Sequence, residues 1–172
     1  MESNIVAIDP GATGSAAFFS NGGLVQVQAF GGNLADMKTL LDFLKYRNTE
    51  KAFVENVHAM KRDGKKSAFS FGRRKAEVEL TLYLAGAEMV LVDVQTWPKL
   101  LGLPKRYEIS DEKKRRAARR KDQENLAKAL YPALCSYEAD IWASVLIGYS
   151  QLIKEDDNLK RWLMHCRREL GW

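Results

Sequence analysis

The sequence predicts an α/β fold with a mixed, five-stranded sheet flanked by helices. Three observations lead to this fold class. Short apolar runs separated by glycine turns fill the first thirty residues, segments with helical and strand periodicity then alternate, and an apolar helix follows late in the chain. Hairpin strands followed by alternating helices and strands are typical of an α/β architecture with a mixed sheet.

The first thirty residues predict an antiparallel meander of three strands. Ile5–Ile8 is rich in β-branched residues and shows no helical period, so we expect a buried strand there. A Pro-Gly pair ends this strand, and Gly14 permits a tight return into a second strand at 15–19. Gly22 and Gly23 then separate the second strand from a third at 24–30.

Helices and strands alternate after the meander. Asn33 is a suitable N-cap for a helix whose apolar residues follow the 3.6-residue period. The next predicted elements are a short buried strand at 51–54 that ends in Glu55, a basic loop at 56–66, a long helix at 67–84 and a strand at 88–94.

The last third of the chain predicts helices. Residues 102–112 are irregular, with Ser110 as the expected cap of a basic helix that runs to about Leu130 and is ended by Pro132. An apolar helix is expected at 141–153. We expect one domain over 1–172, with 155–172 as a C-terminal helical extension whose apolar stripe packs on the core.

Length, charge and cysteine use limit the class of protein. A chain of 172 residues with 46% hydrophobic residues can bury one good core. The formal charge is +5, and KKRRAARRK at 113–121 holds seven basic residues in nine, which indicates a polyanion partner or a solvated helix face. The two cysteines lack metal-ligand spacing, and we find no signal peptide or membrane span, so we expect a soluble, cytoplasmic protein without a membrane partner.

Three acidic side chains occur where predicted elements meet. Asp9 ends the first strand, Glu55 ends the fourth, and Asp140 stands at the start of the late apolar helix. The carboxyl ends of neighbouring strands lie side by side, so the three acids together predict a site for a hard divalent cation such as Mg²⁺. Simpler alternatives are a turn hydrogen bond for Asp9, a loop cap for Glu55 and a helix-dipole contact for Asp140.

Four segments together resemble the successive motifs of the RuvC-like Holliday junction resolvases, particularly the bacteriophage type. They are AIDPGATGSAAF (7–18), FVEN (53–56) followed by a basic loop and SAFSFG (67–72), VDVQTWPKLLG (92–102) and EADIWASVLIGY (138–149). The resemblance covers nearly the whole chain except the C-terminal tail. It implies an RNase H-like fold and a homodimeric, magnesium-dependent endonuclease that cuts four-way DNA junctions by symmetric nicking during recombination and repair.

The resemblance also implies which acids bind metal. Asp9, Glu55 and Asp140 match the family's catalytic acids, which implies two Mg²⁺ ions per active site, with Mn²⁺ as a substitute. The family has a fourth acid three or four residues before the last one, where this chain has none, and Glu138 is the nearest substitute. Asp93 is a further candidate that the resemblance does not support.

Basic residues match the family's DNA contacts. Lys121 is the best match for a lysine that assists the chemistry, with plain phosphate binding as the alternative. His58 lies in the loop that the family places at the junction centre and can stack there, although a structural role is the simpler expectation. The predicted DNA-binding residues are His58, Lys61, Arg62, Lys65, Lys66, Lys113, Lys114, Arg115, Arg116, Arg119 and Arg120.

Two partners follow from the resemblance: branched DNA, namely four-way junctions with forks and flaps as further substrates, and a second copy of the chain. We expect the homodimer to form through the 67–84 helix, where Phe69 and Phe71 are either core or dimer contacts. Two other functions stay open from the residues. DPGATG also resembles the first phosphate loop of actin-like ATPases and sugar kinases, and the missing fourth acid is compatible with a non-catalytic junction-binding protein.

Overall fold

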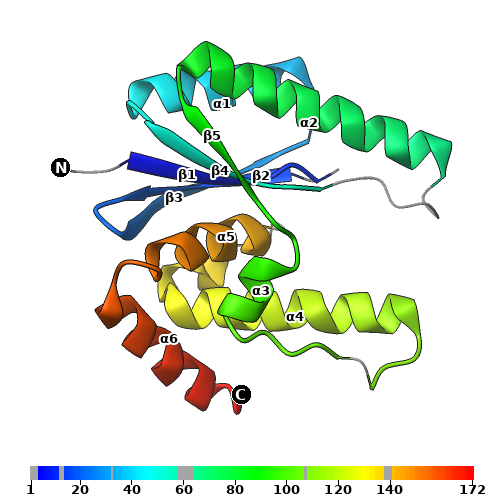
Figure 1. Cartoon of the computed structure of the whole chain (residues 1–172), viewed down its shortest axis with the longest axis vertical. Helices are drawn as coiled ribbons and strands as arrows, with labels where there is room; N and C mark the ends of the chain where they lie inside the picture. Colours follow the sequence, from blue (N-terminus) through cyan, green and yellow to red (C-terminus); the bar gives the residue numbers. More distant parts are fainter. Residues whose placement is uncertain (1–3, 12–13, 32, 58–63, 107, 138–140) are drawn as a thin grey trace.

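A computed structural model describes residues 4–11, 14–31, 33–57, 64–106, 108–137 and 141–172. Within this part of the chain a five-stranded mixed sheet lies between two layers of helices, as Figure 1 shows, and the predicted fold class is confirmed. The strands are β1 (Asn4–Asp9), β2 (Gly14–Ser20), β3 (Gly23–Phe30), β4 (Lys51–Glu55) and β5 (Glu88–Val92). The helices are α1 (Leu34–Tyr46), α2 (Lys65–Ala85), α3 (Thr96–Leu100), α4 (Glu112–Leu130), α5 (Trp142–Leu152) and α6 (Asp157–Glu169), with a 3-10 segment η1 (Pro132–Ser136).

The order of the strands brings the ends of β1 and β4 together. The order is β3-β2-β1-β4-β5, with β1, β2 and β3 antiparallel and with β4 parallel to both β1 and β5. Ile8 pairs with Val54 in the register of β1 and β4. Asp9 and Glu55 each follow one member of that pair, so they lie beside each other at the carboxyl edge of the sheet.

Alternating side chains of the strands feed two cores. Val6, Ile8 and Phe18 pack with residues of α1 and α2, whereas Ala7 and Phe19 pack in the core that includes residues of α3, α4, α5 and α6. Figure 1 shows these two layers of helices on the two faces of the sheet. The apolar helix α5 packs directly on β1 and β2. A Cβ at Gly148 would lie 2.1 Å from the Phe19 ring, so only glycine permits this close approach.

Gly14, the first residue of β2, has no room for a side chain. A Cβ at this position would lie 2.2 Å from the Phe30 ring and 2.9 Å from the Asp9 carbonyl oxygen. The next turn differs slightly from the prediction. Asn21 (φ 52°) and Gly22 (φ 77°) form it, which is the Asn-Gly signature of a tight hairpin, and β2 and β3 are therefore each longer by one or two residues.

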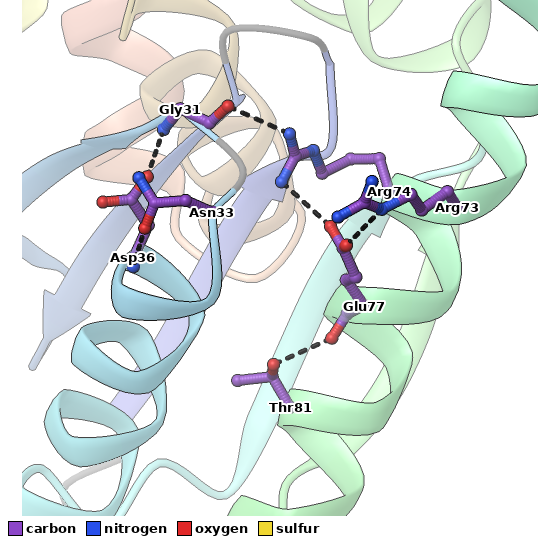
Figure 2. Close-up of polar contacts among 7 residues, drawn as sticks. All are labelled: Gly31, Asn33, Asp36, Arg73, Arg74, Glu77 and Thr81. Atoms are coloured by element: carbon purple, nitrogen blue, oxygen red, sulfur yellow. Dashed lines mark hydrogen bonds and ion pairs between the residues drawn. The ribbon is translucent and has the colours of Figure 1, made fainter.

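Helix α2 is tied to the connection between β3 and α1 by the polar network in Figure 2. The largely buried Arg74 donates to the Gly31 carbonyl oxygen (3.1 Å) and to Glu77 Oε2 (3.0 Å). The Asp36 carboxylate accepts from the Gly31 N–H (2.8 Å), and Asn33 Oδ1 accepts from the Asp36 N–H (2.9 Å), which confirms the predicted cap. The network therefore fixes α2 against the end of β3.

Several boundaries differ from the sequence predictions. Helix α2 begins at Lys65, two residues before the predicted start. Strand β5 ends at Val92 because Asp93 Oδ1 accepts from the N–H groups of Gln95 (2.7 Å) and Thr96 (3.0 Å) and starts the unpredicted helix α3. The expected cap of α4 was wrong: Asp111, rather than Ser110, accepts from the Lys114 N–H at 2.8 Å.

The C-terminal helix α6 packs on α4, far from the sheet (Figure 1). Leu163 and Cys166 are buried in the same core as α5, and Leu159 and Leu170 are partly buried against it, as the apolar stripe predicted. Trp162 is 42% exposed and donates to the Leu130 carbonyl oxygen at 3.3 Å. That residues 155–172 form an extension of a single nuclease domain stays a prediction. Across the described ranges, no helix has the length and apolar character needed to cross a membrane.

Candidate metal and nucleic-acid site

Asp9 and Glu55 open into one cleft at the carboxyl edge of the sheet. Asp9 Oδ1 accepts a hydrogen bond from the Gly11 N–H at 2.9 Å, so the simple turn contact expected for this acid is present. This contact does not remove Asp9 from the cleft, which its side chain still lines. The hydrogen bond from Gly11 therefore orients the Asp9 carboxylate and leaves it accessible to a ligand in the cleft.

Glu55 is held by a tryptophan from a different element. Trp97 of α3 is 2% exposed, and its Nε1–H donates to Glu55 Oε1 at 2.8 Å. The pKa of Glu55 is raised to about 7, chiefly by burial and then by repulsion from Asp9 and, more weakly, from Asp93, while the Trp97 hydrogen bond opposes the rise. A bound cation would offset the repulsion between these two carboxylates and favour their charged forms.

The cleft has a volume of about 820 Å³. Its floor contains Asp9, Glu55 and Trp97, and Ala143 from the first turn of α5 also lines it. One face of α4 forms a further wall of the cleft. The α4 residues that line the cleft are Glu112, Lys113, Arg116, Ala117, Arg119, Arg120 and Gln123.

Four of the predicted DNA-binding residues lie on this α4 wall, namely Lys113, Arg116, Arg119 and Arg120. Arg116 also contacts Glu112 at 2.5 Å, an exposed ion pair of the kind that contributes little to stability. Lys113, Arg116 and Arg120 are spaced by three and four residues and so share one helix face. The cleft therefore contains both a row of cations and a pair of acids.

Other residues of the basic block hold the irregular segment before α4. Arg115 donates to the Ile109 carbonyl oxygen (3.3 Å), and Arg119 donates to the Lys105 carbonyl oxygen (3.1 Å) while also lining the cleft. Arg106 forms a bidentate pair with the buried Asp122 of α4, at 2.7 and 2.8 Å. These contacts hold the segment and α4 together, which the charge run alone did not predict.

Lys121, the predicted catalytic lysine, lies outside the set of residues that line the cleft. Its Nζ is 3.1 Å from Glu124 Oε2, and Glu124 also pairs with Lys128 at 2.7 Å. Lys114 is exposed on α4 but does not line the cleft, and Lys65 is exposed at the start of α2. His58, Lys61, Arg62, Glu138 and Asp140 lie outside the described residues, as does the side chain of Lys66.

Sequence reasoning gave no role to several residues of the cleft. Trp97 lies in the VDVQTWPKLLG segment that carried part of the family resemblance, and this segment was the one available signal for it. Glu112 and Gln123 line the cleft from α4 without any distinguishing pattern in the sequence. Asp93, the further acid candidate, is engaged by its capping bonds to the start of α3.

The donors at the edge of the sheet fit a hard divalent cation. Carboxylate oxygens are the ligands that Mg²⁺ prefers, and it commonly uses one or two of them together with waters. Asp9 and Glu55 supply two such groups from adjacent strands. Among the residues that the structure describes, no group of three or more His, Cys, Asp or Glu side chains forms a metal site.

Holliday junction resolvases are among the solved structures that resemble this fold. Thermus thermophilus RuvC with a Holliday junction substrate aligns with a TM-score of 0.58 and 12% identity, covering 98% of this chain and 96% of RuvC. Another structure of that RuvC gives a TM-score of 0.54 at 13% identity, with the same coverage. The chain adopts the RuvC fold.

A viral resolvase has the same architecture. The fowlpox virus resolvase, solved with Holliday junction DNA, aligns with a TM-score of 0.54 and 14% identity, covering 88% of this chain and 97% of the resolvase. The RNase H-like fold that the resemblance implied is therefore confirmed. Comparisons with protein-family models and with curated protein sequences find no match.

Proposed function

We propose that this chain is a magnesium-dependent, structure-selective DNA endonuclease that resolves Holliday junctions and related branched DNA by symmetric hydrolytic nicking. One observation carries the proposal: the acids of two adjacent strands share a cleft with the cationic face of α4. The fold shared with RuvC and the fowlpox virus resolvase, both solved with junction DNA, supports this substrate class. It also favours the nuclease over the actin-like phosphate-binding alternative.

The α4 wall is the proposed contact for the DNA backbone. Lys113, Arg116 and Arg120 follow one another by about one helical turn, which is about 5.4 Å along the axis. Cations in such a row bind successive phosphates of one strand by charge and carry little sequence information. The strand bound there lies across the cleft from Asp9 and Glu55, which places a phosphodiester near both acids.

The acid pair is the proposed metal site, with Asp140 and Glu138 as further ligands. Mg²⁺ held by these carboxylates, as one or two ions, would supply activation of the attacking water and stabilisation of the leaving oxygen of a phosphodiester. Asp9 and Glu55 hold the cation through their carboxylates, and their fixed hydrogen bonds to Gly11 and Trp97 keep both groups in place. A non-catalytic junction binder has no use for two mutually repelling acids at this edge.

Lys121 stays a prediction as the lysine that assists the chemistry. Its Nζ forms an ion pair with Glu124, and Lys121 is not among the residues that line the cleft. A role at the scissile phosphate requires Lys121 to leave this pair when DNA binds. Lys113 already lines the cleft, so the two lysines can be compared directly by substitution.

A homodimer through α2 is the proposed assembly. Helix α2 exposes large apolar side chains, with exposed fractions of 74% for Phe69, 59% for Leu80 and 80% for Tyr83, so Phe69 is not part of the core. Met89 and Leu91 of the edge strand β5 add apolar surface beside α2, because they pair with strand residues that face α1 and α2. Symmetric nicking needs two active sites related by a two-fold axis, which such an interface supplies.

The proposed process and compartment follow from this activity. Resolution of junctions belongs to DNA recombination and repair, and the phage-type motifs suggest action in the cytoplasm, that of the host cell for a phage protein. Mn²⁺ is expected to substitute for Mg²⁺, because both are hard cations that accept carboxylate ligands.

The test uses labelled four-way junction, fork, flap and duplex DNA, with and without Mg²⁺. We expect Mg²⁺-dependent paired nicks in the junction, and Asp9→Asn should lower the cleavage rate by at least about 100-fold while junction binding survives. Asp42→Asn, which changes an exposed acid of α1, is the matched control and should cut normally. Cleavage by Asp9→Asn at the normal rate contradicts the assignment, and binding without cleavage by the wild type favours the non-catalytic alternative.

A further inference from the structure

We infer that Trp97 is a positioning residue of the acid pair: its indole N–H fixes the Glu55 carboxylate at the edge of the sheet and thereby tightens the binding of a divalent cation. The inference rests on the proposed function, because it concerns the same site. Its basis is one contact between distant parts of the chain, the 2.8 Å hydrogen bond from Trp97 Nε1 to Glu55 Oε1. Glu55 gains this donor from helix α3 rather than from its own strand.

Trp97 is itself immobilised on two sides. Its ring is buried in the core between the sheet and α5, together with Val92 and Leu101. The start of α3 is fixed by Asp93, whose Oδ1 accepts from Gln95 and from both the N–H and the hydroxyl of Thr96. An indole N–H is a donor only, so a carboxylate is a suitable partner for it at this buried position.

The hydrogen bond opposes a competing arrangement of Glu55. A glutamate side chain has three rotatable torsions, and Lys113 and Arg116 line the same cleft as Glu55. Rotation of the carboxylate away from Trp97 would change its position relative to Asp9. By holding Oε1 at the floor of the cleft, Trp97 keeps the two acids together. Loss of a group that orients a metal ligand typically weakens metal affinity by about 10- to 100-fold.

The experiment compares Trp97→Phe with the wild-type protein. Phenylalanine retains an aromatic ring and removes the N–H, and we expect calorimetry to show Mg²⁺ affinity about 10- to 100-fold lower. Junction cleavage should fall at low Mg²⁺ and recover at saturating Mg²⁺. A role in packing alone would instead lower cleavage at every Mg²⁺ concentration. Trp162→Phe is the matched control, because it also loses an indole hydrogen bond, to Leu130, but lies on α6 away from the acids.

The outcomes separate this inference from the proposed function. Unchanged Mg²⁺ affinity in Trp97→Phe, while the wild type binds Mg²⁺, overturns the inference and leaves the nuclease proposal standing. Cleavage that high Mg²⁺ cannot restore also overturns it, in favour of a packing role. A wild-type protein that neither binds Mg²⁺ nor cuts junctions overturns the proposed function and this inference with it.

The wild-type protein provides a second measurement that does not depend on the folding of Trp97→Phe. Its four tryptophans give four indole N–H signals in a ¹H–¹⁵N correlation spectrum, which substitution of the other three assigns. We expect Mg²⁺ to shift the Trp97 signal in the wild type but not in Glu55→Gln. A Trp97 signal that does not move while Mg²⁺ binds overturns the inference.

Discussion

Replacing Glu55 by Gln should stabilise the metal-free protein at alkaline pH while abolishing its activity. Glutamine has nearly the same shape, and its carbonyl oxygen can still accept the Trp97 hydrogen bond, but it cannot ionise. The Glu55 carboxylate is charged above pH 7 only at the expense of burial and of repulsion from Asp9. Glu55→Gln removes both costs, together with a proposed ligand of the metal.

The magnitude follows from the two pKa values. Burial and the neighbouring acids raise the pKa of Glu55 from 4.5 to about 7. Between these values the folded protein keeps a proton that the unfolded chain has lost, so stability falls as the pH rises from about 4.5 to about 7. The full loss is about 3.4 kcal/mol, at about 1.36 kcal/mol per pH unit. Glu55 also faces the open cleft, and solvent screening reduces the expected gain to about 1 to 3 kcal/mol.

The assay is urea or thermal unfolding followed by circular dichroism, with EDTA, between pH 4.5 and 8. At pH 8 the variant should unfold about 2 to 10 °C higher than the wild type, and the two should converge toward pH 4.5. Added Mg²⁺ should stabilise the wild type and narrow the gap. Glu50→Gln, at an exposed position just before β4, is the control and should show no such pH dependence. Equal stability of Glu55→Gln and wild type at pH 8 in EDTA would refute the reasoning.

Two further predictions concern assembly and the basic block. Leu80→Arg should yield a monomer in light scattering and should abolish paired nicking in a junction assay. Leu34→Arg, at an exposed site on α1, is the control and should remain dimeric. A wild-type protein that is monomeric and fully active would contradict the dimer. Replacing Arg116 and Arg120 by Gln should weaken binding to all DNA shapes and flatten the log–log salt dependence by about 1.8, at about 0.9 per phosphate contact. Arg115→Gln should leave that slope unchanged, because its guanidinium binds the Ile109 carbonyl oxygen, and an equal loss in both variants would contradict the assignment of the α4 wall.

Local signals were enough for most of the fold. The strand before Asp9 and the helix after Asn33 could be predicted because their signals are local. A β-branched run favours a strand at its own position, and a capping residue starts the helix that directly follows it. Helix α3 was missed because five residues are too few to display a helical period, and its start depends on the capping bonds of Asp93. The cap of α4 was misplaced by one residue, since Ser110 and Asp111 are both capable caps and only the backbone geometry distinguishes them.

The site was less accessible to sequence reasoning than the fold. Asp9 and Glu55 could be paired in advance because both end buried strands, and parallel strands bring their carboxyl ends together. The Trp97 hydrogen bond joins residues 42 positions apart, and no periodicity marks such a contact. The charge run at 113–121 predicted a basic helix but not its division into a cleft wall and a set of loop contacts, because that division depends on the rotation of α4 about its axis.

Because the α4 cations and the acid pair line the same cleft, the binding of DNA and the binding of metal should be thermodynamically coupled. Before DNA arrives, Lys113, Arg116 and Arg120 raise the electrostatic potential at the floor and oppose the entry of a dication. Under the proposed function, phosphates bound to the wall would remove that opposition, and DNA would increase the affinity for metal. Thermodynamic linkage requires the reverse effect to be equally large, and metal must tighten DNA binding by the same factor. Under the proposed function, the full set of charges would be assembled only when a DNA strand and a cation are present together, so the protein would carry little bound metal in the absence of DNA.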